Sequence, residues 1–470
     1  MQYASILRRS SVESRFGLDT HSARLVELVA NSELSELDDA TIHALRIFLA
    51  DTLAVGIAGK CNPAAEGILA AMQANGGAGE VSCLGRPDVS LPAHQAAVVN
   101  GFQIHCLEWD GLHEPSVVIA LCANVAALHA ELANSDASLG ELLLAFAVGV
   151  ETAVFFGSAA ASAPRFFRPS AAGVMGAAMA VGKLRGYNAE QIHNLLGLAF
   201  SQVSGTMQAH WEGSEALALQ VGFAARAAIT AADLVAHGIT GPREVVSGKF
   251  GYFTLIETPE NLDGVLAKWG KPWKITEMAH KPFPAGRATQ SVLTALLKMR
   301  EERDFDVEEL VTVRADVPSL IALLVSRPWS PDMSPAYARL CLEYVVPRML
   351  LDRTIDPARF TDDYLGEPEI EQLAARVECV VDDNPDPNAL GPQSVTIALK
   401  DGTELSQFVD APLGSPGFPL SAEQRVDKIA RCFVAGDWDA DPADFMAAFE
   451  NAALDQQARN LVFAQTGGGV

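Results

Sequence analysis

Small residues crowd the apolar helical segments in the first half of this 470-residue chain. The segment at residues 171–178, for example, reads AAGVMGAA. Alanine and glycine allow helix axes to approach closely, and a helix that is apolar on every side must be covered by its neighbours. This composition therefore predicts a tight helical core in the first half of the chain.

Apolar residues recur at three- and four-residue spacing from about residue 22 to residue 236, with Gly or Pro between the runs. This period is typical of amphipathic and buried helices. It predicts helices at 45–58, 93–104, 116–132, 139–156, 171–184, 189–207 and 216–237.

The sequence pattern changes after Trp269. Alternating or β-branched stretches at 310–317, 377–382 and 394–409 predict strands, and the residues 400–403, KDGT, are a hairpin turn signal. Helical periodicity lies between these stretches and returns after them, at 288–303, 336–351, 421–433 and 442–461.

These patterns together predict a mainly α fold. A large all-helical domain is expected at residues 18–267 and 413–465, with a smaller α+β lid domain inserted at 268–412. Residues 1–17 and 466–470 are predicted to be flexible termini. Because the chain crosses twice between the domains, this arrangement suits a cleft with a lid.

The chain is acidic, with 34 Lys and Arg against 58 Asp and Glu and a formal net charge of −24. This balance argues against nucleic acid and anionic membrane surfaces as partners. The longest apolar run, 116–133, contains Asn124, His129 and Glu131, whereas about 20 clean apolar residues are needed to span a bilayer. It is predicted to be a buried helix.

The seven cysteines are scattered and show no CxxC or Cys/His spacing of a metal cage. We therefore predict no metal site and a reduced, cytoplasmic compartment. The motifs typical of NAD, ATP, zinc hydrolysis and serine hydrolysis are also absent, since the glycines at 76–79 follow a helix pattern instead of a strand.

Acid–base side chains gather at residues 100–113, NGFQIHCLEWDGLH, before a long apolar helix. The segment contains His105, Glu108, Asp110 and His113. Glu108 and Asp110 are two residues apart and cannot share one helix face, which predicts that the helix ends or turns near Asp110. The segment is expected to line a cleft where protons are transferred.

Four motifs in this order resemble the MmgE/PrpD superfamily, whose members include 2-methylcitrate dehydratase, cis-aconitate decarboxylase and iminodisuccinate epimerase. They are RIFLADTLAV at 46–55, the 100–110 segment, GFAAR at 222–226 with GITGP at 238–242, and KPFP at 281–284. The similarity runs from about residue 25 to 433. It implies an all-helical domain, an α+β lid, a homodimer, a site between the domains that uses no cofactor, and small di- or tricarboxylate substrates.

The resemblance implies catalytic roles for four residues. Asp110 matches the aspartate of the signature, His113 matches a histidine of some members, Lys281 matches a basic site residue, and Tyr337 matches a lid tyrosine. The structural alternatives are a helix cap for Asp110, exposed side chains for His113 and Lys281, and a core aromatic for Tyr337.

Four further residues are predicted to bind substrate: His105, Glu114, Arg168 and Arg287. Arg287 follows Lys281 in the same proline-fixed loop and could bind a carboxylate in a bidentate way. His105 matches the signature, but its apolar neighbours favour a hydrogen-bonded core histidine as the alternative.

Three positions depart from the family pattern. Arg168 stands where the family has a histidine, and Leu217 stands where it has a lysine. Glu114 lies in Glu-Pro-Ser, where decarboxylase-like members carry a histidine. An arginine stays protonated and cannot transfer a proton, and the leucine removes a cation. These changes argue against cis-aconitate decarboxylation and favour a dicarboxylate, with Glu114 as an amine ligand or second base.

The sequence therefore predicts a lyase that needs no cofactor and acts next to a carboxylate of a small hydroxy-di- or tricarboxylate, as a dehydratase does. One alternative is an epimerase that removes and returns an α-proton of a dicarboxylate such as iminodisuccinate. The other is a relative that binds carboxylates without catalysis. Which residue is base and which is acid depends on geometry and pKa.

Overall fold

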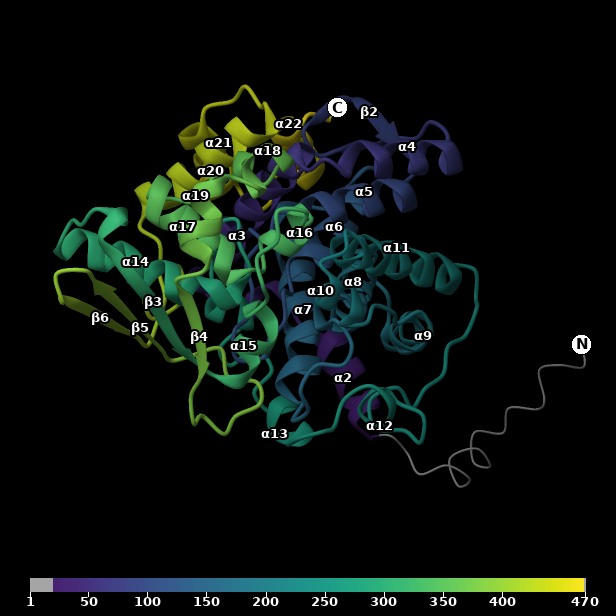
Figure 1. Ribbon diagram of the computed structural model, residues 1–470. Coiled ribbons are helices and arrows are strands. Elements are labelled where there is room, and N and C mark those ends of the chain that lie inside the picture. Colours follow the sequence, from purple (N-terminus) through teal and green to yellow (C-terminus); the bar gives the residue numbers. More distant parts are fainter. Residues whose placement is uncertain (1–19, 469–470) are drawn as a thin grey trace, which may run out of the picture.

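The computed structural model describes residues 20–468 (Figure 1). Most of them form helices. We call residues 20–267 and 413–468 the helical body. Its helices are α2 Thr20–Asn31, α3 Asp39–Ala58, α4 Ala65–Gly76, α5 Ala93–His105, α6 Cys122–Leu132, α7 Leu139–Ser158, α8 Arg168–Leu184, α9 Ala189–Phe200, α10 Gln208–Glu212, α11 Ala216–Ala236, α12 Tyr252–Leu255, α13 Leu262–Leu266, α20 Ala422–Gly436, α21 Pro442–Glu450 and α22 Ala458–Thr466.

Small residues do set the helix spacing in this body. Helix α5 packs on α11, and α7 packs on α8. A Cβ built on Gly101 of α5 would lie 2.7 Å from the Cα of Gly222 of α11. That distance is shorter than carbon atoms tolerate, so glycine is required for this close approach. The prediction of a tightly packed helical core is confirmed.

The remaining residues form the sheet region, 268–412, at the left of Figure 1. Its sheet has the order β4-β3-β5-β6, where β3 pairs parallel with β4 and antiparallel with β5, and β5 pairs antiparallel with β6. The elements are α14 Gln290–Glu302, β3 Leu310–Val317, α15 Ser319–Val325, α16 Pro335–Ala338, α17 Leu342–Asp352, α18 Asp362–Leu365, α19 Pro368–Ala374, β4 Val377–Val381, β5 Gln393–Leu399 and β6 Glu404–Val409.

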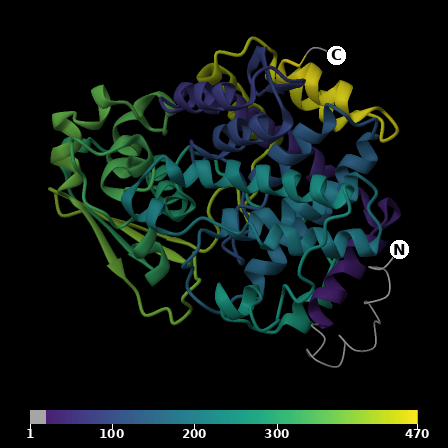
Figure 2. The same cartoon turned by 90° about the vertical axis from the view of Figure 1, so that its right-hand side faces the viewer.

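The three predicted strand stretches are confirmed, and the predicted KDGT turn joins β5 to β6. After β6 the chain returns to the helical body, where α20 and α21 pack against α3 (Figure 2). The elements thus lie in a helical body and an inserted α+β region. That the α+β region acts as a lid is a proposal.

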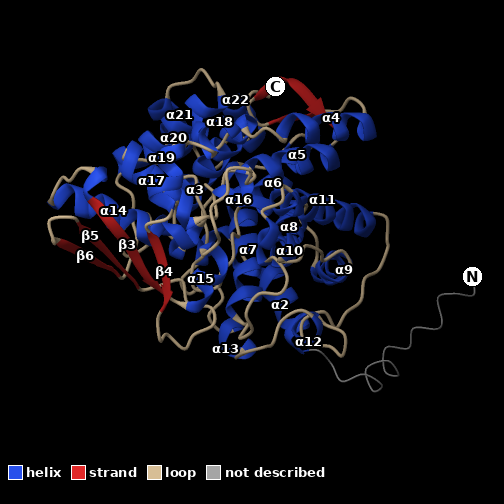
Figure 3. Cartoon of the chain, viewed as in Figure 1, coloured by secondary structure: helices blue, strands red, loops and turns tan. Residues whose placement is uncertain are grey.

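The structure corrects several predicted boundaries. The first half is not all-helical, because β1 Val81–Cys83 and β2 Arg86–Leu91 form a small antiparallel hairpin, the upper red pair in Figure 3. The helix expected at 116–132 starts only at Cys122: Val117 has a φ of 54°, outside the helical range, and Val118 pairs with the backbone of His113. The long helices expected at 336–351 and 442–461 are each two helices.

Of the predicted flexible termini, residues 1–17 and 469–470 lie outside the described residues. Thr466 is described and does not fit the prediction, because it ends α22 and its side chain is fully buried.

Three segments in the described part of the chain are long and apolar enough to cross a membrane by length and composition. They are Asp39–Cys61, Leu139–Ser158 and Ala216–Ala236, and the most apolar windows within them are 83%, 94% and 61% buried inside the protein. In this fold their apolar side chains pack against other helices.

Candidate active site

The acid–base segment lies where the helical body meets the sheet region. Helix α5 ends at His105, and the chain then turns through Glu108, whose φ of 52° lies in the left-handed region. Leu112 and Ala279 next exchange two backbone hydrogen bonds, of 3.0 and 2.8 Å. This pairing brings Lys281 beside the segment, although the two are far apart in sequence.

Four buried groups form what we call the ionic cluster: His105, Glu108, Asp110 and Lys281. The His105 Nδ1 lies 3.0 Å from the Asp110 Oδ2, and the Lys281 Nζ donates to the Glu108 Oε2 at 3.0 Å. Nζ is also 3.5 Å from the Asp110 Oδ1. His105 Nε2 is 3.3 Å from the Glu108 Oε1 but is not aligned for a hydrogen bond.

The cluster holds its members in their charged forms. Burial alone would favour the neutral forms, but Lys281 and His105 lower the pKa of both Glu108 and Asp110 on balance. In return, the two carboxylates raise the pKa of His105 and of Lys281 against the same cost of burial. Each shift favours the charged form of its group, so the two acids and the two bases stabilise one another inside the protein.

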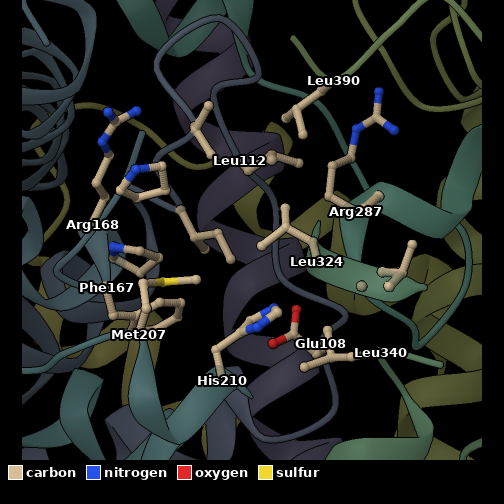
Figure 4. A pocket seen from close by; sticks show the side chains of 17 residues that line it. Glu108, Leu112, Phe167, Arg168, Met207, His210, Arg287, Leu324, Leu340 and Leu390 are labelled. Atoms are coloured by element: carbon tan, nitrogen blue, oxygen red, sulfur yellow. The ribbon is translucent and has the colours of Figure 1, made fainter. Parts of the chain in front are cut away.

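Beside the cluster is the main candidate site, a cavity lined by both the helical body and the sheet region. Figure 4 shows its lining. The lining residues are Glu108, Leu112, Val117, Ile119, Pro164, Phe167, Arg168, Pro169, Met207, His210, Gly286, Arg287, Ala288, Leu324, Val325, Leu340 and Leu390.

Glu108 is the member of the ionic cluster that reaches this cavity; Asp110 and Lys281 do not line it. In Figure 4 the His210 imidazole lies next to the Glu108 carboxylate. Burial, with the nearby Arg327 guanidinium, lowers the pKa of His210 to about 4. Arg327 approaches the His210 Nδ1 at 3.2 Å. Both groups at this end of the cavity are therefore unprotonated at neutral pH.

Arg287 lies across the cavity from Glu108 in Figure 4. Its Nε donates to the Glu114 Oε1 at 2.7 Å, and its Nη2 lies 2.6 Å from the same oxygen. The buried Nη1 has no hydrogen-bond partner. A buried arginine donor without a partner is unfavourable unless a ligand accepts a hydrogen bond from it, which agrees with the prediction that Arg287 binds substrate.

Arg168 differs from Arg287, because protein oxygens accept from all of its nitrogens. Nε and Nη2 donate to Glu257 at 2.8 and 3.3 Å, and Nη2 also donates to the Ser162 carbonyl at 2.7 Å. Nη1 donates to the Ser116 carbonyl and to Asn388 Oδ1, both at 3.1 Å. No N–H group is left for a substrate carboxylate, so we correct the prediction: Arg168 ties the sheet region to the helical body.

His113 and Tyr337 do not line the cavity either. The His113 Nδ1 lies 2.9 Å from the Ser116 Oγ, and its Nε2 lies 3.1 Å from the Glu277 Oε2. The Tyr337 hydroxyl donates to the Pro328 carbonyl at 2.9 Å. Because these polar atoms are bonded to the protein away from the cavity, the structure gives both residues structural contacts in place of the predicted catalytic ones.

The other predicted residues have clear positions. Asp110 is not a helix cap and Lys281 is not a surface lysine, because both are fully buried in the ionic cluster. His105 was predicted to bind substrate, but it does not line this cavity. It is instead the hydrogen-bonded core histidine that its apolar neighbours favoured as the alternative. Glu114 contacts Arg287 and does not line the cavity, so its predicted direct role is not supported by the geometry.

A second, smaller cavity also has Glu108 in its lining. Leu217, which stands where the family pattern has a lysine, lines it together with His105 and Arg339. Arg339 is 1% exposed, and its Nε has no partner. Burial lowers the pKa of this guanidinium. The sheet region thus supplies a cation near the position where the lysine is missing.

His105, Asp110 and Cys122 are also close enough to hold a metal ion, since one ligand atom of each lies within 4.8 Å of the others. However, the Lys281 ammonium already lies 3.5 Å from Asp110, and burial raises the pKa of the Cys122 thiol well above its usual value. A cation would be repelled by Lys281 and would meet a protonated thiol, so this set does not fit a metal well.

Comparison with known families identifies the chain. Residues 23–264 match the MmgE/PrpD N-terminal domain, and residues 283–436 match the MmgE/PrpD C-terminal domain. The chain belongs to the MmgE/PrpD family. The predicted resemblance is therefore confirmed.

Several named proteins are similar to this MmgE/PrpD protein. Cis-aconitate decarboxylase from Homo sapiens is 30% identical over 361 residues, 73% of each chain. The Mus musculus cis-aconitate decarboxylase is 27% identical over 419 residues, 85% of this chain and 84% of the relative. A 2-methylcitrate dehydratase from Cupriavidus necator is 31% identical over 138 residues, 27% of each chain. Decarboxylation and dehydration are both lyase reactions, and the protein is a lyase.

The sequence did not identify two residues that line the cavity of this MmgE/PrpD protein. Glu108 was noted only as a neighbour of Asp110. Its side chain reaches the cavity because the backbone turns there in the left-handed conformation, which a glutamate in the sequence does not predict. His210 lies in a short helix, α10, with no motif around it. Its proximity to Glu108 arises from the packing of segments that are distant in sequence.

Proposed function

We propose that this MmgE/PrpD protein is a lyase, without need of a cofactor, that removes a proton from a carbon next to a carboxylate of a small hydroxy-carboxylate, as a dehydratase does. The observation that carries this proposal is the Glu108 carboxylate. It faces the cavity, and Lys281 and His105 behind it lower its pKa, so that it is ionised and able to accept a proton.

The reaction follows from the positions of the groups. One substrate carboxylate accepts a hydrogen bond from the free Nη1 of Arg287, and the substrate extends from there across the cavity toward Glu108. Glu108 takes the proton from the substrate carbon beside it, and the C–H electron pair forms a C=C bond as the C–O bond breaks. Glu108 returns the proton to the departing hydroxide, which leaves as water. Glu108 is then ionised again, and the charges of Lys281 and His105 behind it favour that form.

Decarboxylation is the second candidate, and the similarity to cis-aconitate decarboxylases over most of the chain favours it. Loss of CO2 leaves a carbanion that needs a proton donor. Glu108 and His210, the titratable groups at the reacting end of the cavity, are both unprotonated at neutral pH. Base-initiated elimination therefore fits the cavity better than protonation of a carbanion.

Epimerisation fits the site less well. An epimerase needs two acid–base groups on opposite faces of the substrate carbon, whereas Glu108 and His210 lie side by side in Figure 4. The relatives are named for decarboxylation and dehydration, and neither reaction involves epimerisation.

Proton NMR in D2O tests the proposal with a panel of citrate, 2-methylcitrate, cis-aconitate and tartrate. Dehydration of a hydroxy acid gives a new olefinic signal without loss of CO2, and Glu108→Gln lowers its rate about 10²- to 10⁴-fold, as expected for loss of a general base. Glu404→Gln, on the exposed edge of β6, is the control and keeps the wild-type rate. Full turnover by Glu108→Gln, or CO2 release as the reaction of the wild type, contradicts the proposal.

A further inference from the structure

The cavity has an unusually apolar lining for a site that binds carboxylates. Only four of its 17 lining residues, Glu108, Arg168, His210 and Arg287, carry a charged or imidazole side chain. Most of the others are aliphatic, aromatic or proline residues. In Figure 4 the side chain of Leu324 lies between the Glu108 end and the Arg287 end.

The positive charge available to a ligand is small. The N–H groups of Arg168 all have protein acceptors, and His210 is neutral at neutral pH. Arg287 alone among the lining residues has a buried donor without a partner. Burying a carboxylate without a cation or donor is strongly unfavourable, so this cavity suits a ligand with fewer carboxylates better than one with three.

The apolar wall comes from both regions of the molecule. The helical body contributes Leu112 and Phe167, and the sheet region contributes Leu324, Leu340 and Leu390. All but Leu324 are less than 9% exposed, so the wall continues the hydrophobic core of the protein. Such a surface gains free energy only when apolar atoms cover it.

We infer that the substrate is a carboxylic acid with an aliphatic substituent, which packs between Leu112 and Leu324 while Arg287 holds the carboxylate. The inference rests on the proposed function for the position of the reacting carbon next to Glu108, and it adds the chemical class of the group beside it. Small, uniformly polar tricarboxylates are then poor ligands.

Calorimetric titration of the full-length protein with a series of 2-alkylsuccinates, from succinate to 2-pentylsuccinate, tests the inference. These acids lack the hydroxyl group that dehydration removes, so binding is measured without turnover. We expect the Kd to fall about fourfold for each added methylene until the cavity is full. Tricarballylate, which has three carboxylates and no alkyl group, is expected to bind more weakly than 2-butylsuccinate.

Two neighbouring leucines of α15 provide a matched pair of variants. Leu324 lines the cavity, whereas Leu323 is 49% exposed and does not. Leu324→Asn is expected to flatten the dependence on chain length while succinate affinity changes less than twofold. Leu323→Asn is expected to leave the whole series unchanged. Thermal melting of each variant verifies that it is folded.

A wild-type Kd that stays constant or rises with chain length overturns the inference, as does tighter binding of tricarballylate than of 2-butylsuccinate. Because this wild-type series involves no variant, misfolding of Leu324→Asn does not affect it. Failure of the proposed function has a different signature: Glu108→Gln turns substrate over at the full rate while the dependence of binding on chain length persists.

Discussion

Two arginines line the same cavity but have opposite hydrogen-bonding states. Arg168 gives its N–H groups to Glu257, Asn388 and two carbonyls, whereas Arg287 keeps one nitrogen without a partner. The residue type alone does not reveal this difference, because both were predicted to bind substrate. The neighbouring acceptors decide which arginine is available.

Replacement of each arginine by glutamine is expected to separate the two roles. Arg287→Gln loses a charge-assisted hydrogen bond to substrate of about 1.5–3 kcal/mol, which raises KM roughly 10- to 150-fold with little loss of melting temperature. Arg168→Gln leaves Glu257 buried and unpaired, which lowers the free energy of unfolding by about 3–5 kcal/mol. Steady-state kinetics and thermal melts check both. An Arg168→Gln protein with normal stability and a raised KM contradicts the assignment.

Glu114 is expected to act through Arg287 instead of touching the substrate. Glu114→Gln weakens the ion pair that holds the guanidinium and raises KM, with kcat nearly unchanged. In a double-mutant cycle, adding Glu114→Gln to Arg287→Gln should therefore have little further effect on KM. Additive effects on KM, or a large fall in kcat for Glu114→Gln alone, would show an independent role such as a second base.

The sequence singled out His105, Glu108 and Asp110 within one segment, and the family motif singled out Lys281, but neither predicted that the four form one ionic cluster. The prediction chose the wrong carboxylate to face the cavity. That choice depends on the φ angle of Glu108. A non-glycine residue carries no mark in the sequence that it will adopt the left-handed conformation.

At the scale of elements, the contact between α5 and α11 sets the position of the acid–base segment that follows α5. A Cβ on Gly222 would overlap the backbone carbonyl of Val98, which cannot move without shifting α5. Gly222→Ala is therefore expected to destabilise the protein by about 1–3 kcal/mol through overpacking. Chemical denaturation with urea measures this change.

Gly67→Ala is the matched control for this substitution, because Gly67 lies in helix α4 with no atom within 4 Å of its would-be Cβ. There alanine is expected to stabilise the protein by about 0.5–1 kcal/mol through helix propensity. If both substitutions changed stability in the same direction, the close approach of α5 and α11 would not explain the requirement for glycine.

Periodicity predicted the long helices and the three longer strand stretches because each covers several repeats of its pattern. It missed the hairpin of β1 and β2, where β1 has only three residues. It also joined 116–121 to helix α6, although the positive φ of Val117 interrupts the helix there. Short elements and single backbone angles are set by tertiary contacts, which one sequence does not display.

At the scale of the whole molecule, three buried histidines couple folding to pH. Burial lowers the pKa of His129 and His210 to about 4 and that of His280 well below its usual value. Between pH 6.5 and about 4 the unfolded chain therefore binds more protons at these positions than the folded one. Their contribution to stability falls as the pH falls. Glu151, whose buried carboxyl has a raised pKa of about 7, acts in the opposite direction.

His129→Asn isolates one of these contributions. The stability of the variant relative to the wild type is expected to rise by up to about 1.4 kcal/mol per pH unit as the pH is lowered from 6.5 towards 4. Urea denaturation across this window measures the slope. His43→Asn, at an exposed position, serves as the control. Parallel pH profiles for His129→Asn and wild type would contradict the depressed pKa of His129.

The left-handed backbone at Glu108 also bears on how this protein evolves. A glutamate in that conformation costs about 1–3 kcal/mol that a glycine would not, so Glu108→Gly should relax the backbone while it removes the carboxylate. The same substitution would take from the buried Lys281 its hydrogen-bonded carboxylate partner. Evolution is therefore expected to keep an acidic residue at this position despite the strained backbone.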